Sequence, residues 1–311
     1  MFDFLYITWD LNPIIVKLGP LAIRYYSLLF IAGFPLGYWL FIKFFKKEGI
    51  NTDLLEPLLY ALLIGTIVGA RLGHCLFYEP HYYFVEHPEE ILKVWHGGLA
   101  SHGGAIGVLL AIFWYVRRYG PKNGFDTMWL LDRLVITICF AGCLIRLGNL
   151  FNSEIFGGPT TLPWGFKFPQ SSIWVRDFGP AVYPPDGLAC HPTQLYEALS
   201  YLLLGLFLLW VYNKKLDKVY KGWIFGVFLI VLFGVRSIIE FLKLNGQIED
   251  VSWINKGQLL SIPFIIAGIA ILIIYRKKNL PAKLEVKKNE EPEQKGPRMS
   301  RAKRKAAGMK Q

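Results

Sequence analysis

The chain has 311 residues, of which 53% are hydrophobic and 16% aromatic, and its formal net charge is +11. The apolar residues gather in long blocks, and this distribution is typical of a membrane protein and argues against a soluble domain. Residues 1–16 carry Asp3 and Asp10 among aromatic residues and lack a basic beginning, so they do not have the pattern of a cleavable signal peptide. We expect them to lie along the membrane surface.

Seven apolar blocks follow, each of roughly 20 residues, which is the length that crosses the hydrocarbon core of a bilayer. None shows the alternation of a barrel strand, so each block must satisfy its backbone internally as a helix. The sequence therefore predicts an all-α polytopic membrane protein with about seven transmembrane helices. We place the spans near residues 20–43, 55–78, 97–117, 127–146, 194–213, 222–243 and 258–276.

Basic residues lie in the loops after the first, third and fifth blocks, whereas the loop after the second block holds mainly glutamates. Cytoplasmic loops carry an excess of lysine and arginine, so these three loops are predicted to be cytoplasmic. With seven spans, the N-terminus then lies outside and the C-terminus in the cytoplasm. The basic residues are Lys43, Lys46, Lys47, Arg117, Arg118, Lys122, Lys214, Lys215, Lys218 and Lys221.

The predicted organisation is a transmembrane domain over residues 1–278 and a tail over 279–311. The long loop 158–192, between spans four and five, is rich in proline and tryptophan and is predicted to form an extracytoplasmic cap. The tail is basic and has few residues able to build a core, so we expect it to be disordered and cytoplasmic. A basic tail after a last span more often fixes topology near anionic lipid than binds nucleic acid.

Four polar residues, Arg146, Asn149, Asn152 and Glu154, end the fourth block within nine positions. An ionised side chain at bilayer depth costs about 3 kcal/mol, so such groups face a cavity or a partner. Together with Arg236 they form a candidate site for a phosphodiester, which arginine grips with two parallel hydrogen bonds. The alternative is a pair of structural ion pairs, because acids follow both arginines and Glu240 is four positions after Arg236.

Two glycine pairs flank His102, and Gly103 and Gly104 form the second of them. Paired glycines weaken a helix more than packing requires, which suggests backbone close to a ligand. His102 itself is either a base or a hydrogen-bonding residue of the helix bundle. The four cysteines, Cys75, Cys139, Cys143 and Cys190, show no metal or redox spacing, so we expect neither a metal nor a disulfide.

The residues from Arg146 to Gly157 read Arg-x-Gly-Asn-x-x-Asn-x-Glu-x-x-Gly, and this pattern resembles the signature of the bacterial prolipoprotein diacylglyceryl transferases. Three further blocks resemble that family in the expected order, so the resemblance covers about residues 1 to 278. These blocks are Trp95 to Gly107, His191 to Glu197 and Gly234 to Glu240.

The resemblance implies an enzyme of the bacterial inner membrane without metal or cofactor. It would transfer a diacylglyceryl group from phosphatidylglycerol to the lipobox cysteine of a prolipoprotein signal peptide, and it would bind membrane lipid but no nucleic acid. His102 would help to make the thiolate, because a free thiol has a pKa of about 8.5. The catalytic residues implied are His102, Arg146, Arg236 and Tyr26, although Tyr26 is equally placed to be an interface anchor. The implied lipid-binding residues are Arg146, Asn149, Asn152, Glu154, Gly157, Arg236, Glu240, Gly103 and Gly104.

Two other classes of function remain open from the sequence. A transporter of an anionic solute would also need buried charged residues, but it would be expected to carry an internal repeat, and the motif blocks are unlike one another. A lipid-binding assembly protein would not need His102. The absence of His-Glu-x-x-His and Gly-x-Ser-x-Gly from the sequence weighs against a zinc protease and a serine hydrolase.

Overall fold

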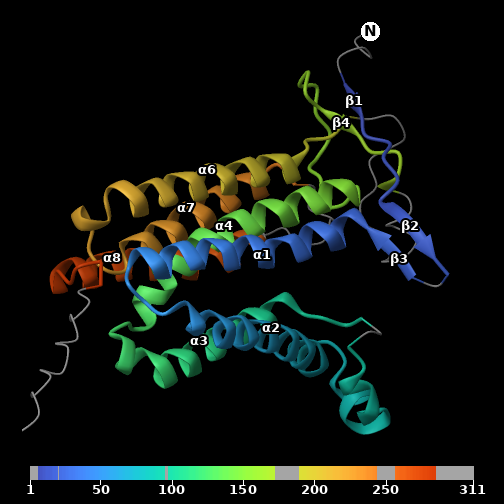
Figure 1. The fold of residues 1–311 in the computed structure, drawn as a ribbon. Coiled ribbons are helices and arrows are strands. Elements are labelled where there is room, and N and C mark those ends of the chain that lie inside the picture. The colour runs from blue at the N-terminus through green and yellow to red at the C-terminus, as the bar shows by residue number, and fades with distance from the viewer. Residues whose placement is uncertain (1–5, 20, 95–96, 172–188, 244–255, 285–311) are drawn as a thin grey trace, which may run out of the picture.

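The computed structural model describes residues 6–19, 21–94, 97–171, 189–243 and 256–284. This part of the chain is mostly helical, as predicted (Figure 1). The long helices are α1 (Tyr25–Lys47), α2 (Leu55–Phe77), α3 (Ser101–Asn123), α4 (Thr127–Phe151), α6 (Thr193–Lys214), α7 (Trp223–Glu240) and α8 (Lys256–Lys278).

Among the described residues, six helices are long and apolar enough to cross a membrane: α1, α2, α4, α6, α7 and α8. The third expected span, 97–117, corresponds to α3, which begins at Ser101. Its first turn contains a histidine and two glycines and its end contains Arg117 and Arg118, so its mean hydropathy is lower than that of the six. A multi-pass membrane protein is confirmed, and a seventh span stays a prediction.

Figure 1 shows α1, α4, α6, α7 and α8 side by side as one bundle, with α2 and α3 forming a hairpin set apart from it. Glycines hold this hairpin together at very short range. A Cβ on Gly69 would lie 2.4 Å from the carbonyl oxygen of Gly103, and one on Gly65 would lie 2.6 Å from that of Gly107. Close approach of α2 and α3 therefore explains why these positions are glycine.

Short strands lie at the end of the bundle where α1 begins and α4 ends. Strand β1 (Ile7–Thr8) pairs in parallel with β4 (Phe166–Lys167), and β2 (Ile14–Leu18) pairs antiparallel with β3 (Leu21–Arg24). The N-terminal segment is thus tied to the loop that follows α4. Most of the expected cap, residues 172–188, lies outside the described residues.

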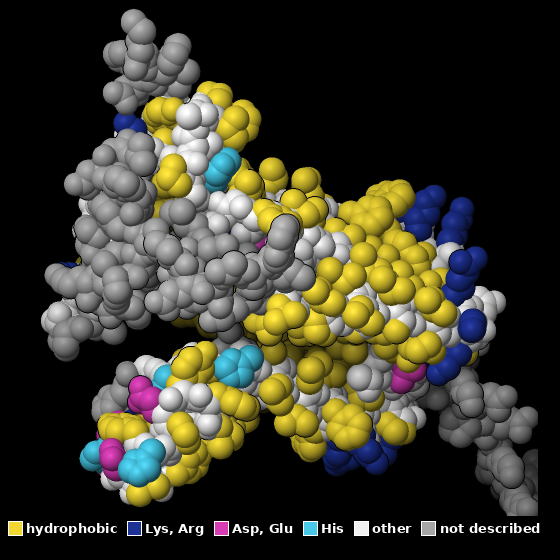
Figure 2. Space-filling model, turned by 180° about the vertical axis from the view of Figure 1, so that it is seen from behind, with side chains coloured by type: hydrophobic (Ala, Val, Ile, Leu, Met, Phe, Trp, Pro, Cys, Tyr) yellow, Lys and Arg dark blue, Asp and Glu magenta, His cyan; other side chains and the backbone are white. Residues whose placement is uncertain are grey.

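Hydrophobic side chains cover most of the helical surface that Figure 2 shows, and Lys and Arg side chains gather at one end of the molecule. This exposed apolar surface is what lipid contact requires, since a soluble monomer rarely exposes so large a continuous patch. Exposed examples from different helices are Ile64, Leu110, Leu203 and Leu260.

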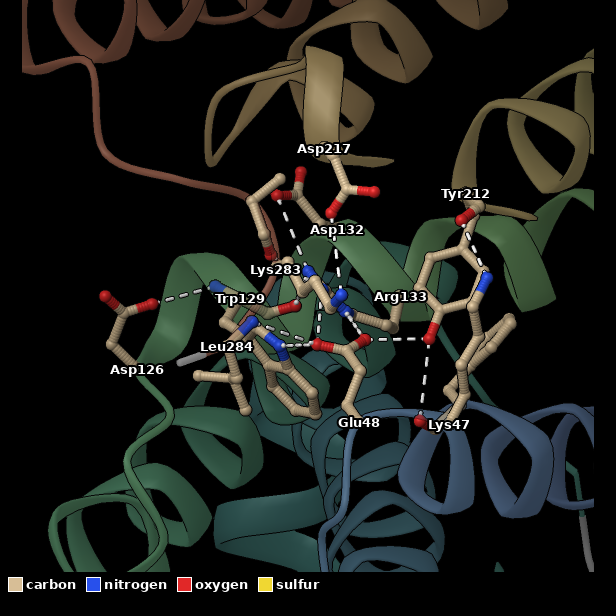
Figure 3. Close-up of polar contacts among 12 residues, drawn as sticks. Lys47, Glu48, Asp126, Trp129, Asp132, Arg133, Tyr212, Asp217, Lys283 and Leu284 are labelled. Atoms are coloured by element: carbon tan, nitrogen blue, oxygen red, sulfur yellow. Dashed lines mark hydrogen bonds and ion pairs between the residues drawn. The ribbon is translucent and has the colours of Figure 1, made fainter. Parts of the chain in front are cut away.

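A fully buried ionic network lies between α1, α4 and α6, near the start of α4 (Figure 3). The Glu48 carboxylate accepts hydrogen bonds from Trp129 Nε1 at 2.8 Å, from Arg133 Nε at 3.0 Å and Nη2 at 2.8 Å, and from the Tyr212 hydroxyl at 2.7 Å. Arg133 also donates to the carbonyl oxygen of Ala282 at 2.7 Å. We call these five residues the Glu48 network.

The first residues after α8 belong to this packed region. The Lys221 N–H donates to the carbonyl oxygen of Leu280 at 2.8 Å, and Ala282 is only 1% exposed. Residues 279–284 of the predicted tail are therefore anchored on the bundle, and the rest of that tail lies outside the described residues.

Candidate functional site

The predicted polar stretch lies at the end of α4, where the chain turns back sharply. Helix α4 ends at Phe151. Asn152 is its C-cap residue, and the Asn152 N–H donates a hydrogen bond to the Gly148 carbonyl oxygen at 3.0 Å. Ser153 and Ile155 then have φ angles of 53° and 58°, a backbone region that costs a non-glycine residue on the order of 1–3 kcal/mol. This strained turn places the buried Glu154 beside α4.

The turn brings together the four polar residues that the sequence singled out. Arg146 Nη1 donates to Asn149 Oδ1 at 3.1 Å, and Asn149 Nδ2 donates to Glu154 Oε1 at 2.6 Å. Asn152 Nδ2 reaches the same carboxylate oxygen at 3.2 Å. The two amides and the carboxylate therefore hold one face of the guanidinium in a fixed position.

Two further charged residues, Glu197 and Lys243, complete this site. Neither was predicted from the sequence to be a site residue. Glu197, on α6 and 1% exposed, forms an ion pair with Arg146 Nε. Lys243 Nζ lies 2.7 Å from the other oxygen of Glu197 and 3.2 Å from Glu240 Oε2. We call Arg146, Asn149, Asn152, Glu154, Glu197, Glu240 and Lys243 the Arg146 cluster.

Arg236 lies near this cluster without being bound into it. It is partly buried on α7, and no hydrogen bond or ion pair joins it to any described residue. The charges of Arg146 and Arg236 both act on the hydroxyl group of Tyr201, on α6, so both guanidinium groups lie within electrostatic range of it. A local ion pair between Arg236 and Glu240, the structural alternative, is not seen among the described residues.

Tyr26 packs against the end of α4. A Cβ on Gly148 would lie 2.8 Å from the Tyr26 ring, and the Tyr26 hydroxyl is within electrostatic range of Glu154 and Arg146. Its neighbour Tyr25 stacks on Phe151 with ring centroids 4.5 Å apart. Tyr26 therefore faces the Arg146 cluster from α1.

Gly157 and the start of α6 hold the turn in place. The Gly157 N–H donates to the His191 carbonyl at 2.8 Å, and a Cβ on Gly157 would lie 2.6 Å from the Leu242 carbonyl oxygen. Gln194 Nε2 donates to the Glu154 carbonyl at 2.6 Å. Residue 157 is therefore a glycine because the chain packs closely here against the segments that contain His191 and Leu242.

Several buried polar atoms around the cluster have unused hydrogen-bonding capacity. Asn152 Oδ1, Ser153 Oγ and Gln194 Oε1 are buried and have no hydrogen-bond partner among the described residues. Native proteins pair the large majority of such atoms with protein, water or ligand. Two of these atoms lie on the turn and the third on α6 beside it, so together they offer hydrogen-bonding positions to water or to a polar ligand.

Burial raises the pKa of the Glu154 carboxyl above its ordinary value, against the opposing effects of hydrogen bonds from Asn149 and Asn152 and of the Arg146 charge. A carboxylate that is harder to ionise takes up a proton earlier on acidification. The protonation of Glu154 is therefore coupled to the hydrogen bonds that position Arg146.

His102, Gly103 and Gly104 lie on α3 in the hairpin, and no described contact joins them to the Arg146 cluster. His102 is exposed, and its ring lies against Phe77 and Tyr78 with centroids 5.2 and 5.9 Å away. Gly103 and Gly104 face α2, so helix packing accounts for both.

The loop that leads to His102 is fixed by a buried arginine. Arg71, on α2, donates to the Ile91 carbonyl at 3.0 Å and the Gly98 carbonyl at 3.1 Å, and also to the carbonyls of Glu90 and Gly97. Gly97 and Gly98 have φ angles of 88° and 69°, which explains this glycine pair by backbone conformation. Arg71 thus organises the backbone before α3.

Similarity to known proteins extends over nearly the whole helical region. Residues 13–274 match the family model described as prolipoprotein diacylglyceryl transferase. The chain is 45% identical over 271 residues to the phosphatidylglycerol–prolipoprotein diacylglyceryl transferase of Tolumonas auensis, covering 87% of this chain and 98% of the relative. It is 44% identical over 287 residues to that of Porphyromonas gingivalis, covering 90% and 98%. Every residue of the Arg146 cluster falls within the matched region.

Proposed function

The chain belongs to the prolipoprotein diacylglyceryl transferase family, and from this we infer that it is a multi-pass bacterial membrane enzyme that transfers a diacylglyceryl group from phosphatidylglycerol to a prolipoprotein. We propose further that the acceptor is the lipobox cysteine of the signal peptide. The relatives' shared name favours this transferase over a transporter of an anionic solute.

In the proposed reaction the cysteine thiol loses its proton, its sulfur bonds to the glyceryl carbon, and the bond from that carbon to the phosphate oxygen breaks. The products are a thioether and glycerol phosphate. Two features of this reaction need protein groups, because a thiol with a pKa of about 8.5 must be deprotonated and negative charge must be stabilised on the departing phosphate.

The observation that carries the proposal is the contrast between Arg146 and Arg236. Arg146 is held by Glu197 and Asn149, whereas Arg236, on α7 one turn before Glu240, has no hydrogen bond or ion pair with any described residue. We assign Arg236 the bidentate contact with the phosphodiester and Arg146 the fixed positive charge next to it. The unpaired oxygens of Asn152 and Gln194 then accept hydrogen bonds from the glycerol headgroup, whose hydroxyls are donors.

His102 is the proposed base. It is exposed on the hairpin, next to the rings of Phe77 and Tyr78, so a signal peptide can reach its side chain. The cysteine would then lie between His102 and the Arg146 cluster, with Tyr26 on the bundle side. Gly103 and Gly104 are buried against α2, so we assign them no contact with lipid.

We propose that the enzyme lies in the inner membrane with its N-terminus outside and its C-terminus in the cytoplasm. The Lys and Arg side chains at one end of the molecule support this orientation, because basic residues concentrate on the cytoplasmic side (Figure 2). The Arg146 cluster is then near the outer surface.

A vesicle assay tests the function. The full chain is reconstituted with phosphatidylglycerol and a lipobox peptide, and mass spectrometry should detect the added diacylglyceryl mass on cysteine. A peptide with serine in place of that cysteine is the matched control and should stay unmodified. Uptake of an anionic solute into the vesicles without peptide modification would instead support the transporter.

A further inference from the structure

An apolar cavity of about 320 Å³ lies where the hairpin meets the bundle. Helices α1, α2 and α4 supply most of its wall, and α3 contributes Val108. We call this space the α1–α4 chamber. Its lining is hydrophobic except for a few groups such as Thr66 and Thr137, so it is unsuited to the polar headgroup or to a charged peptide.

The chamber begins close to Tyr26, which faces the Arg146 cluster, because the ring of its lining residue Phe30 stacks on the Tyr26 ring with centroids 6.4 Å apart. Its lining on α4 runs from Ile145, the neighbour of Arg146, to Leu134, eleven positions earlier in the same helix. At 1.5 Å per residue this is about 16 Å, close to half of the roughly 30 Å hydrocarbon core. A chamber of this length matches one lipid acyl chain that descends from a headgroup at the Arg146 cluster.

The far end of the chamber is closed by rigid core residues. Phe41, Leu55 and Leu134 line it there and are 4%, 1% and 7% exposed. Phe41 packs edge-on against the rings of Phe44 and Phe45, with centroids 5.8 and 5.9 Å away. A close-packed wall of this kind resists displacement, since interiors are packed like crystals.

We propose that the α1–α4 chamber binds one acyl chain of the lipid donor and that Phe41, Leu55 and Leu134 limit the length of chain it accepts. This inference rests on the proposed function, because it takes the phosphate to lie at Arg146 and Arg236. It adds a specificity-determining site that is remote from the reacting atoms.

Gly37 is the position from which the chamber is best tested. It lines the chamber on α1 opposite Thr137, and a Cβ there would lie 3.6 Å from the Thr137 Cβ, which is ordinary contact. Gly33 is less suitable, because its Cβ would lie 3.1 Å from that of Ala141 and disturb helix packing. A larger side chain at Gly37 should therefore fill the chamber and leave the helices in place.

The experiment measures transfer to a lipobox peptide from a series of phosphatidylglycerols whose saturated acyl chains lengthen by two carbons at a time. Gly37→Leu should reduce the rate with the longest chains, relative to the shortest, by on the order of tenfold. Phe41→Ala should change the same ratio in the opposite direction. Ala32→Leu, on an exposed face of α1, is the matched control and should leave the ratio unchanged.

The ratio of the rate with the longest acyl chains to the rate with the shortest distinguishes misfolding of a variant from a wrong assignment of the chamber. Partial misfolding of Phe41→Ala lowers every rate alike and leaves the ratio interpretable, and the milder Phe41→Leu gives a second measurement. If Gly37→Leu and both Phe41 variants retain the parental ratio, the chamber does not hold the chain. If the parent enzyme modifies no peptide with any of the lipids, the proposed function itself has failed.

Discussion

Helix α4 carries one arginine near each end, Arg133 fully buried and Arg146 partly buried, and their surroundings differ. In the Glu48 network, Arg133 is 0% exposed and donates to Glu48, to the Trp129 carbonyl and to the Ala282 carbonyl. Near the other end, the Arg146 cluster lies beside an unbonded Arg236 and buried oxygens without partners among the described residues. The same types of residue thus make a closed structural network at one end and the proposed binding site at the other. Unused hydrogen-bonding capacity distinguishes them.

The largest effect is expected from breaking the closed network. Arg133→Met should destabilise the protein by about 3–5 kcal/mol, because it leaves Glu48 as an uncompensated buried charge. Thermal unfolding in detergent measures this. Lys122→Met, an exposed basic residue, is the matched control and should change stability by less than about 0.5 kcal/mol.

Replacing both Glu48 and Arg133 tests whether the uncompensated charge causes the loss of stability. The double variant Glu48→Leu with Arg133→Met should recover much of the loss, since a buried pair exchanged for apolar residues is often neutral. A double variant as unstable as the single one would show that the hydrogen bonds to Trp129 and Tyr212 matter more than the ion pair.

His102 tests whether the Arg146 cluster is sufficient for the reaction. His102→Gln should lower transfer by roughly two to four decades while unfolding is unchanged, because the amide cannot accept the thiol proton. Raising the pH by one unit below the thiol pKa should restore activity nearly tenfold, since the thiolate fraction rises in that proportion. Near-full activity at pH 7, or a deficit without pH dependence, would place the base elsewhere.

Arg236→Ala should lower kcat/KM by on the order of a hundredfold, which corresponds to about 3 kcal/mol of transition-state stabilisation. Stability should change little, because no described residue depends on its charge. Arg236→Lys should recover only part of the loss, since ammonium cannot make the bidentate contact. Lys17→Ala, a basic residue on an exposed strand, serves as the control. Full activity in the lysine variant would contradict bidentate binding.

A smaller effect is expected from Glu154→Gln, in the range of tenfold in rate, because one charged hydrogen-bond acceptor is lost. The raised pKa of Glu154 means that the folded state disfavours its ionised form, so its contribution to stability is lost as the pH rises through that pKa. At neutral pH the variant should therefore be no less stable than the parent, unlike a Glu48 variant. The activity of the parent should fall on acidification above the ordinary carboxyl range, and the variant should lack this fall.

The helices and the local part of the site could be predicted because both depend on nearby residues. Arg146, Asn149, Asn152 and Glu154 lie within one turn-forming segment, so their proximity follows from sequence distance. Glu197 and Lys243 were missed because their bond joins residues 46 positions apart on different elements. A single sequence carries no direct signal for the rotation of a helix about its axis. The available signs of Glu197 were its place as an acid inside the apolar block of α6 and as the last residue of the block from His191 to Glu197.

The Glu48 network was missed for the same reason, since Glu48 and Arg133 are 85 positions apart. The paired strands β1 and β4 have two residues each and lack any detectable periodicity. The relation of His102 to the cluster depends on how the hairpin sits against the bundle, which no local pattern determines.

The contact between Arg133 and the carbonyl of Ala282 joins residues 149 positions apart, and it has a consequence for biosynthesis. Bacterial ribosomes extend a chain by about 5–20 residues per second, so Arg133 is made roughly 7–30 seconds before its last acceptor. During that time its partner Glu48 is already in place, but the guanidinium is not fully paired. Insertion of α8 and the residues after it therefore completes the bundle, and a chain truncated before Leu280 would leave an unfinished core for membrane proteases to recognise.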